Sequence, residues 1–396
     1  MMREIRSDSA TTGMRALPTH FLPPPSLASN GTPARLRAGN SSDAQQLQNE
    51  FFPTLHVLGA AKAGSTSLHE SLHQNGVCGC LVDDDVDICQ NGKELSIWYS
   101  EAPSVALRNL TAEGYSSLFG PRAAGVACRA YADGTPTRLH TWYSANELGH
   151  LAAAAKATQK LRLIALLREP VARHLSWYNH RLTTPRLSKW SFWTSRQASC
   201  QPWFGALPGG HAPPHLALVR CEYEHWQSKG CQRSIGNATA ECWIRSQQAS
   251  SSPSWIEGGI YLPQLLLWQR RFPRGQLLVL QFEQTIREGV ARALDFAGLG
   301  APERVGEAVG GPSIMLPHNN SKPSQCKQSQ VHCSVVRMLV PLYKPWNSLL
   351  LQQLHRDTAT GKAPRQEPAF PEFPTPECIE VQEERPPVNL SLCTPV

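Results

Sequence analysis

The fold is decided by one stretch, Thr54-Leu-His-Val-Leu-Gly59-Ala-Ala-Lys62-Ala-Gly64-Ser65-Thr66-Ser67-Leu68. Its apolar residues up to Gly59 predict a short buried strand. A turn of small residues follows, and the pattern from Ser65 to Gln74 predicts a helix. A strand that passes through a tight turn directly into a helix is typical of an α/β protein.

The turn has the chemistry of an anion cradle. The first N–H groups of a helix have no partner within the helix, and the helix dipole adds positive potential there. Gly64 permits close approach of the backbone, and Lys62 brings a full positive charge. We therefore predict that a phosphate group is bound by Lys62, Ala63, Gly64, Ser65, Thr66 and Ser67. The alternative is an ordinary helix start rich in serine and glycine, with a lysine on the surface.

The order of residues in this turn argues against an ATP site. In the loop Gly-x-x-x-x-Gly-Lys-Ser/Thr the lysine follows the glycine and stands beside the hydroxyl that binds magnesium. Here Lys62 precedes Gly64. The pattern favours a phosphate ester bound without a metal. A magnesium-dependent nucleotide kinase is the alternative enzyme class.

Further apolar runs alternate with helical patterns. Strands are predicted at 161–167 and 276–282. Helices are predicted at about 170–182 and 261–272, and a further helix face runs from 286 to 297. Such alternation implies a P-loop-like parallel sheet flanked by helices, with ligands beyond the carboxyl ends of the strands. The predicted fold class is α/β.

A second anion-binding segment follows the strand at 161–167. Arg168 stands at the carboxyl end of that strand, where its guanidinium can grip a phosphate in a bidentate way. Ser176 lies two helical turns further on. The turn between them can bring both groups to one anion. The alternative is that Arg168 forms an ion pair at the strand end and Ser176 faces solvent.

Together the two segments resemble the signature loops of sulfotransferases that use 3′-phosphoadenosine 5′-phosphosulfate (PAPS), most of all the Golgi enzymes for heparan and chondroitin sulfate. In that family the first loop holds the 5′-phosphosulfate, and an arginine and a serine eight residues later hold the 3′-phosphate. The resemblance assigns these roles to 62–67 and to Arg168 with Ser176. It extends from about Phe51 to about Leu354, with further matches at Lys93-Glu94, Asp133-Gly-Thr-Pro136, Gly259-Ile-Tyr261 to Trp268, Leu277-Leu-Val-Leu280 and Tyr343-Lys-Pro-Trp-Asn347.

The resemblance also implies the reacting groups. Transfer of a sulfuryl group to an alcohol needs a base, and Glu94 matches the segment in which these enzymes carry their catalytic glutamate. Lys62 is expected to stabilise charge on the bridging oxygen of the leaving phosphate. Lys322, in a loosely matching loop, is expected to close over the nucleotide. Without the resemblance, Lys93 and Glu94 would be interpreted as a solvated charged pair.

The acceptor is less defined. Heparan 3-O-sulfating enzymes usually have a histidine where this chain has Ser96, and a lysine where it has Gly134. Histidines offer alternative bases, namely His56, His69, His73 and His174. We predict a glycosaminoglycan-like polysaccharide or other glycan as the acceptor. A protein tyrosine, or non-catalytic binding of sulfated glycans, are the alternatives.

Composition agrees with an anionic ligand. The formal net charge of +7 is spread too thinly over 396 residues to indicate a nucleic-acid partner.

Twelve cysteines without any Cys-x-x-Cys pair predict disulfides, with Cys326–Cys333 as the first candidate. Together with Asn-x-Ser/Thr triplets they favour the Golgi lumen or secretory pathway. Residues 1–50 contain no signal-like apolar core or membrane anchor. Either a first exon is missing, which is the favoured interpretation, or the protein is not secretory and the triplets are accidental.

Three regions are expected. Residues 1–50 predict a disordered arm or stem, and the Pro-rich residues 358–396 predict a solvated tail. The sulfotransferase domain is expected at 51–357, with a Trp- and Cys-rich insertion at 186–257. The tryptophans of the insertion either shape a carbohydrate cleft or form a small core of their own, and the second interpretation is favoured.

Overall fold

The fold is described from a computed structural model. It describes residues 50–81, 89–90, 92–95, 98, 109–120, 128–183, 200, 211–228, 255–300, 328–365, 367, 370–380 and 387–389. All of these belong to one compact unit, residues 37–396. Lys322 and most of the predicted insertion lie outside the described residues. The domain boundaries set from the sequence stay predictions.

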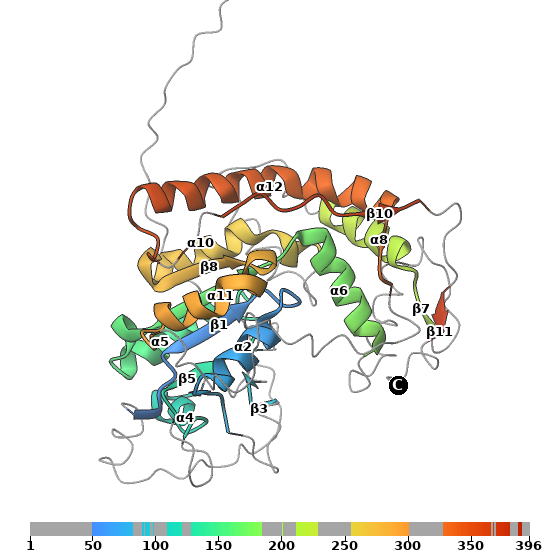
Figure 1. Cartoon of the computed structure of the whole chain (residues 1–396). Coiled ribbons are helices and arrows are strands. Elements are labelled where there is room, and N and C mark those ends of the chain that lie inside the picture. Colours follow the sequence, from blue (N-terminus) through green and yellow to red (C-terminus); the bar gives the residue numbers. More distant parts are fainter. Residues whose placement is uncertain are drawn as a thin grey trace, which may run out of the picture. The chain divides into compact units, whose positions relative to one another are not determined.

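The centre of the fold is a five-stranded sheet (Figure 1). Its strands, in spatial order, are β2 (Val77–Cys78), β5 (Ala130–Asp133), β1 (Leu55–Gly59), β6 (Arg162–Leu167) and β8 (Leu277–Gln281). Each neighbouring pair is parallel. Every residue of β1 and β8 is buried, as expected for strands that helices cover on both faces. The α/β class predicted from the sequence is confirmed.

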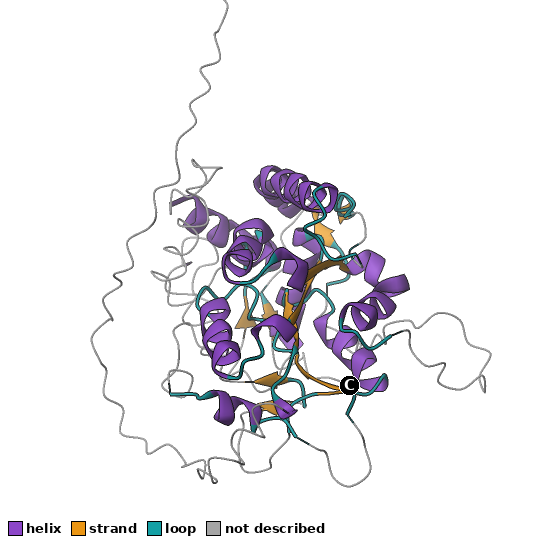
Figure 2. Cartoon of the chain, turned by 90° about the vertical axis from the view of Figure 1, so that its left-hand side faces the viewer, coloured by secondary structure: helices purple, strands orange, loops and turns teal. Residues whose placement is uncertain are grey.

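Helices surround this sheet (Figure 2). α2 (Ser65–Gln74) contacts α11 (Phe282–Phe296), and α11 also contacts β6 and β8. α10 (Tyr261–Arg271) contacts α5 (Ser144–Ala154) and α12 (Cys333–Ala359), and the short α4 (Ala112–Ser116) packs on α5. Apolar side chains from these helices and from the central strands form one large hydrophobic core.

Shorter elements complete the described part of the chain. They are the 3-10 helices η2 (Thr158–Lys160), η4 (Glu257–Gly259) and η5 (Arg274–Gln276), and the two-stranded ladders of β3 (Cys89–Gln90) with β4 (Glu94–Leu95), β7 (His211–Ala212) with β11 (Val388–Asn389), and β9 (Val331–His332) with β10 (Cys378–Ile379).

A second apolar cluster is built by α6 (Pro170–Thr183), α8 (His215–Ser228) and part of α12. α12 joins the two cores, because Leu354 belongs to the sheet core whereas Leu339 belongs to the second cluster. Trp226 and Trp255 are buried in this cluster, which they share with residues of α6 and α12, so they do not form a core of the insertion alone. The other tryptophans of the insertion, Trp190, Trp193, Trp203 and Trp243, lie outside the described residues.

The elements predicted beside the two loops are confirmed. The helix expected at 65–74 is α2, with the same bounds. The strand expected at 161–167 is β6, and the helix that begins at Pro170 is α6. Within the described ranges, no helix is both long and apolar enough to cross a bilayer.

The tail is packed more closely than predicted. Phe370 is 2% exposed and belongs to the sheet core, where a solvated extension was expected. The buried Glu367 accepts a hydrogen bond from the Val279 N–H of β8 at 2.9 Å and forms an ion pair with Arg274. These contacts fix the tail because an apolar ring and a paired carboxylate are both withdrawn from water.

The prediction that the cysteines form disulfides is confirmed, but the predicted pair Cys326–Cys333 is wrong. Cys333, at the start of α12, bonds to Cys378 in the tail and not to Cys326. The fold brings the tail back beside α12. Because Cys378 is 45 residues from Cys333 in the sequence, this proximity could not be predicted from spacing. The other disulfides of the described residues are Cys78–Cys128, Cys80–Cys89 and Cys200–Cys221.

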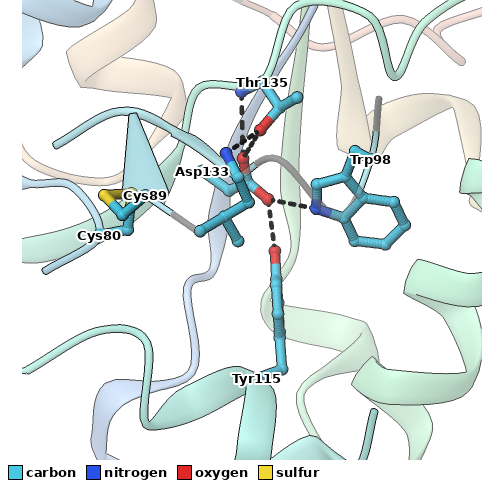
Figure 3. The surroundings of a disulfide bond; sticks show 7 residues. Cys80, Cys89, Trp98, Tyr115, Asp133 and Thr135 are labelled. Carbon is cyan, nitrogen blue, oxygen red and sulfur yellow. Dashed lines mark hydrogen bonds between the residues drawn. A yellow bond between two sulfur atoms is a disulfide. The ribbon is translucent and has the colours of Figure 1, made fainter. Parts of the chain in front are cut away.

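A buried charge network closes the carboxyl end of β5 (Figure 3). Asp133 Oδ2 accepts hydrogen bonds from Trp98 Nε1 at 3.0 Å and Tyr115 OH at 2.6 Å. The same oxygen accepts one from Arg138 Nη1 at 2.8 Å, and Oδ1 accepts from the N–H and hydroxyl of Thr135. Burial alone would raise the pKa of Asp133, but the Arg138 guanidinium and the other donors hold that pKa below its ordinary range.

His56 on β1 extends this network. A guanidinium can only donate, so His56 Nδ1 accepts from Arg138 Nη1 at 2.8 Å and Nε2 donates to Pro53 O at 2.8 Å. Burial and the neighbouring Arg138 lower the pKa of His56 to about 3. The ring is therefore neutral, fully buried and structural, and it is not placed to serve as the alternative base.

We predict that Asp133→Asn destabilises the protein by about 3–5 kcal/mol at pH 7, because Arg138 is then left as an unpaired buried charge. The free energy of unfolding in urea measures this change. Asp295→Asn is the matched control, since Asp295 is exposed on α11 and should leave the unfolding midpoint unchanged. Equal stability of the two variants would contradict the network's role.

Candidate functional site

Three loops meet at one edge of the sheet. β1 lies between β5 and β6 and runs parallel to both, so the carboxyl ends of the three strands are neighbours. The turn after Gly59, the segment after Asp133 and the segment after Leu167 therefore leave the sheet side by side. Ligands of open parallel sheets bind at this edge. The two predicted anion-binding segments belong to it.

The turn after β1 has the geometry of an anion cradle. Lys62 and Gly64 both have left-handed backbones, with φ of 69° and 86°. α2 begins at Ser65, and its N-cap residue, Gly64, has no side chain that could cap the first N–H groups. A Cβ at position 64 would collide with the ring of Phe282. Glycine is therefore required here for two reasons, the left-handed backbone and the lack of space for a side chain. The helix start is thus open to an anion.

Two arginines hold the carbonyl groups of this turn. Arg173 Nε donates to Ala61 O at 3.0 Å, and Arg168 Nη1 donates to Lys62 O at 3.3 Å. The Ala60 N–H is bonded to Leu166 O of β6 at 2.6 Å. Carbonyl oxygens that are already paired with guanidinium groups repel a bound anion less. Arg173 therefore positions the cradle, a role that the sequence did not indicate.

Arg168 keeps capacity for a ligand. Its guanidinium carbon lies 5.0 Å from the centre of the Phe282 ring, and its Nε is buried without a hydrogen-bond partner among the described residues. Burial lowers the pKa of Arg168, which Glu283 partly offsets. An anion at this point would supply the missing partner.

Glu169 fixes the start of α6. Its carboxylate accepts from the N–H groups of Val171 at 3.0 Å and Ala172 at 2.6 Å. Burial raises the pKa of Glu169 to about 7, although both N–H groups favour its ionised form. Ser176, the predicted partner of Arg168, is half-buried on the second turn of the same helix. Its contact with an anion stays a prediction.

Lys93 joins the predicted base to the cradle. Its Nζ donates to Glu94 Oε1 at 2.6 Å and to Thr66 Oγ1 at 2.9 Å. The Glu94 side chain is 19% exposed and the Lys93 side chain 4%. Glu94 is therefore next to the anion cradle and accessible to solvent, whereas Lys93 is buried.

The segment after β5 holds Glu94 in place. The Leu95 N–H donates to Thr135 Oγ1 at 2.8 Å, and that hydroxyl donates to Asp133. The Gly134 N–H donates to Lys93 O at 3.0 Å. Asp133 thus positions the predicted base through one intervening threonine.

Positive charge is concentrated around Lys62. Burial lowers the pKa of Lys62 to about 7; Glu94 opposes this shift, whereas Lys93, Arg181 and Arg173 add to it. Lys62 Nζ lies 5.8 Å from the centre of the Trp177 ring, and the Arg181 guanidinium carbon lies 4.9 Å from the same ring. Several cations that face few carboxylates form a site for an anion.

The histidines considered as alternative bases are less well placed. His174 is fully buried, with Nδ1 2.9 Å from His215 Nε2 and Nε2 3.4 Å from Glu222. His69 is also buried. His73 is exposed, but it stands in the last turn of α2, away from the cradle, with Nδ1 3.0 Å from Val77 O. Glu94 is the best-placed base of this set.

Within the described ranges, no group of three or more His, Cys, Asp or Glu residues is arranged to hold a metal ion. The donor set at the sheet edge consists of lysine and arginine cations, hydroxyls and helix N–H groups, all of which are suited to anions. This chemistry fits a doubly phosphorylated nucleotide or a sulfate ester.

Comparison with known proteins finds likeness among solved structures. No protein-family model matches the chain, and no curated protein matches it. Among solved structures, a sulfotransferase from Alicyclobacillus acidocaldarius is similar, with a TM-score of 0.41 and 17% sequence identity. The match covers 78% of this chain and 98% of that chain. At this TM-score the likeness carries no argument, and the site stands on the contacts given above.

We predict that the amine of Lys62 becomes reactive near neutral pH. Its acylation rate, followed by mass spectrometry from pH 5 to 10, should rise through about pH 7, where burial places the pKa of Lys62. Added sulfate should move this rise to higher pH, because an anion favours the protonated amine. The exposed Lys156 controls for the reagent. A Lys62 rate that rises only above pH 9 without sulfate would contradict the prediction.

Proposed function

We propose that the protein is a sulfotransferase that moves a sulfuryl group from PAPS to a hydroxyl of a glycosaminoglycan-like carbohydrate, without a metal. The observation that carries the proposal is the Lys93 bridge, which places the carboxylate of Glu94 beside Thr66 of the anion cradle. A base adjacent to an anion site is what transfer between a phosphosulfate and an alcohol requires.

The reaction follows from this arrangement. The carboxylate of Glu94 takes the proton of the acceptor hydroxyl, whose oxygen forms a bond to sulfur. The bond between sulfur and the bridging phosphate oxygen breaks, and its electron pair stays on that oxygen. Lys62 stabilises the charge that develops there. The products are a sulfate ester and adenosine 3′,5′-bisphosphate, and Glu94 returns its proton to solvent.

The two phosphate groups of the donor would occupy the two anion-binding segments. The 5′-phosphosulfate fits the cradle at 62–67, where α2 presents its first N–H groups. The 3′-phosphate fits Arg168 and Ser176, and the unpaired Nε of Arg168 supports this assignment. Lys322 would approach the nucleotide from a loop outside the described residues.

The acceptor and the location are part of the proposal. Trp177 and Arg181 lie beside Lys62, and an aromatic face next to a cation suits a sugar ring that carries an acidic group. The disulfides of the described residues support an oxidising compartment such as the Golgi lumen. The experiment is incubation with labelled PAPS and a panel of glycosaminoglycans and algal polysaccharides, followed by disaccharide analysis.

The same experiment separates the alternatives. Label on tyrosine peptides but on no polysaccharide would identify a protein-tyrosine sulfotransferase. Binding of sulfated glycans with no transfer to any acceptor would identify a non-catalytic glycan-binding protein. Magnesium-dependent turnover of ATP would overturn the assignment of the cradle to PAPS.

We predict that Glu94→Gln lowers kcat about a hundredfold or more, because the acceptor hydroxyl loses its base. Affinity for adenosine 3′,5′-bisphosphate, measured by calorimetry, should stay within a few-fold of the original protein. Glu288→Gln, at an exposed position of α11, is the matched control and should retain full activity. Unchanged kcat in Glu94→Gln would remove Glu94 from the mechanism.

We predict that Arg168→Ala weakens binding of adenosine 3′,5′-bisphosphate about ten- to a hundredfold, as expected for loss of a charge-assisted hydrogen bond of roughly 1.5–3 kcal/mol. Binding of adenosine 5′-monophosphate, which lacks the 3′-phosphate, should change far less. Arg162→Ala, at the opposite end of β6, is the control. An equal loss for both nucleotides would show that Arg168 only supports the cradle.

A further inference from the structure

Lys93 is a buried cation whose carboxylate partner, Glu94, also has the proposed role of base. Its side chain is 4% exposed, and its Nζ is within hydrogen-bond distance of one carboxylate oxygen and one hydroxyl. The carboxylate belongs to Glu94, which must be available as a base under the proposed function. A buried ammonium is stabilised by its ion pair and hydrogen bonds, and an anion within reach of its remaining N–H would stabilise it further.

The path of this side chain is built into the fold. Gly134, directly after β5, has no side chain, and a Cβ there would lie 2.7 Å from Lys93 Cγ and 2.6 Å from His69 Cδ2. The Gly134 N–H also holds the main chain of Lys93 through a 3.0 Å hydrogen bond to its carbonyl. Glycine at position 134 therefore leaves room for the lysine stem to pass toward the cradle.

The Lys93 ammonium reaches the cradle, and the contacts described for it leave one of its N–H donors for a ligand. Thr66 is the second residue of α2, so its hydroxyl stands among the helix N–H groups that face an anion. An ammonium has three N–H donors, and the described contacts of Lys93 use two of them. The third is available to an oxygen of an anion held at the helix start.

We propose that Lys93 is a second anion-binding cation of the cradle, which contacts the 5′-phosphosulfate end of the donor and holds Glu94 against it. The inference rests on the proposed function. Lys62 and Lys93 then approach the same end of the donor from two loops, β1–α2 and β3–β4. Because one ammonium binds both the donor and the base, it keeps the carboxylate at the end where sulfur is transferred.

The test compares nucleotides with and without a 5′-phosphate. In Lys93→Met, affinity for adenosine 3′,5′-bisphosphate should fall about ten- to a hundredfold. Affinity for adenosine 3′-monophosphate, measured by competition, should be unchanged, which also shows that the variant is folded. With PAPS and an active acceptor, kcat should fall as well as KM rise. Lys93→Arg should recover part of the lost affinity.

Lys160→Met is the matched control, because Lys160 is exposed in η2 at the other end of β6. Equal losses for both nucleotides in Lys93→Met, or no loss for either, would overturn the role of Lys93. If the unmodified protein binds neither nucleotide and transfers no sulfate, the proposed function itself fails. If the unmodified protein binds the bisphosphate and Lys93→Met binds it as tightly as Lys160→Met does, the inference about Lys93 fails and the proposed function stands.

Discussion

The site depends on the hydrogen bonds that the buried carboxylate of Asp133 accepts. This carboxylate accepts hydrogen bonds from a tryptophan, a tyrosine, an arginine and both donor groups of Thr135, all at the buried end of β5. Thr135 in turn receives the Leu95 N–H, so the position of Glu94 is set from the core of the protein. A base that is held by a rigid network keeps its geometry without further ordering when substrates bind.

The sheet edge carries an excess of positive charge around the cradle. Arg168 and Arg173 each donate to a carbonyl oxygen of the cradle, Lys93 donates to Thr66 in the first turn of α2, and Lys62 belongs to the cradle itself. Burial of these cations carries a cost in the free protein that a doubly charged ligand would repay. The same cost explains why the pKa of Lys62 falls to about 7. Anion binding and the protonation of this lysine are therefore linked.

The sequence was a good guide where one local pattern controls one local structure. The strand, turn and helix at 55–74 were predicted from an apolar run, a turn of small residues and the helical pattern from Ser65, and all three are confirmed. The pairing of Cys333 was predicted wrongly because disulfide partners are chosen by spatial proximity. The tail was predicted as solvated from its many prolines, a composition that gives no sign that Phe370 is buried in the sheet core and that Phe373 packs against it.

By itself the sequence determined the α/β class, the turn of small residues between β1 and α2 and the arginine after β6, since each depends on neighbours along the chain. Only the tertiary structure decided that Lys93 bridges Glu94 to Thr66, that Arg173 supports the cradle and that Gly134 gives the lysine its path. These contacts join residues separated by 27 to 112 positions, and no local pattern encodes such distances. They arise because parallel strands bring their carboxyl ends to one edge.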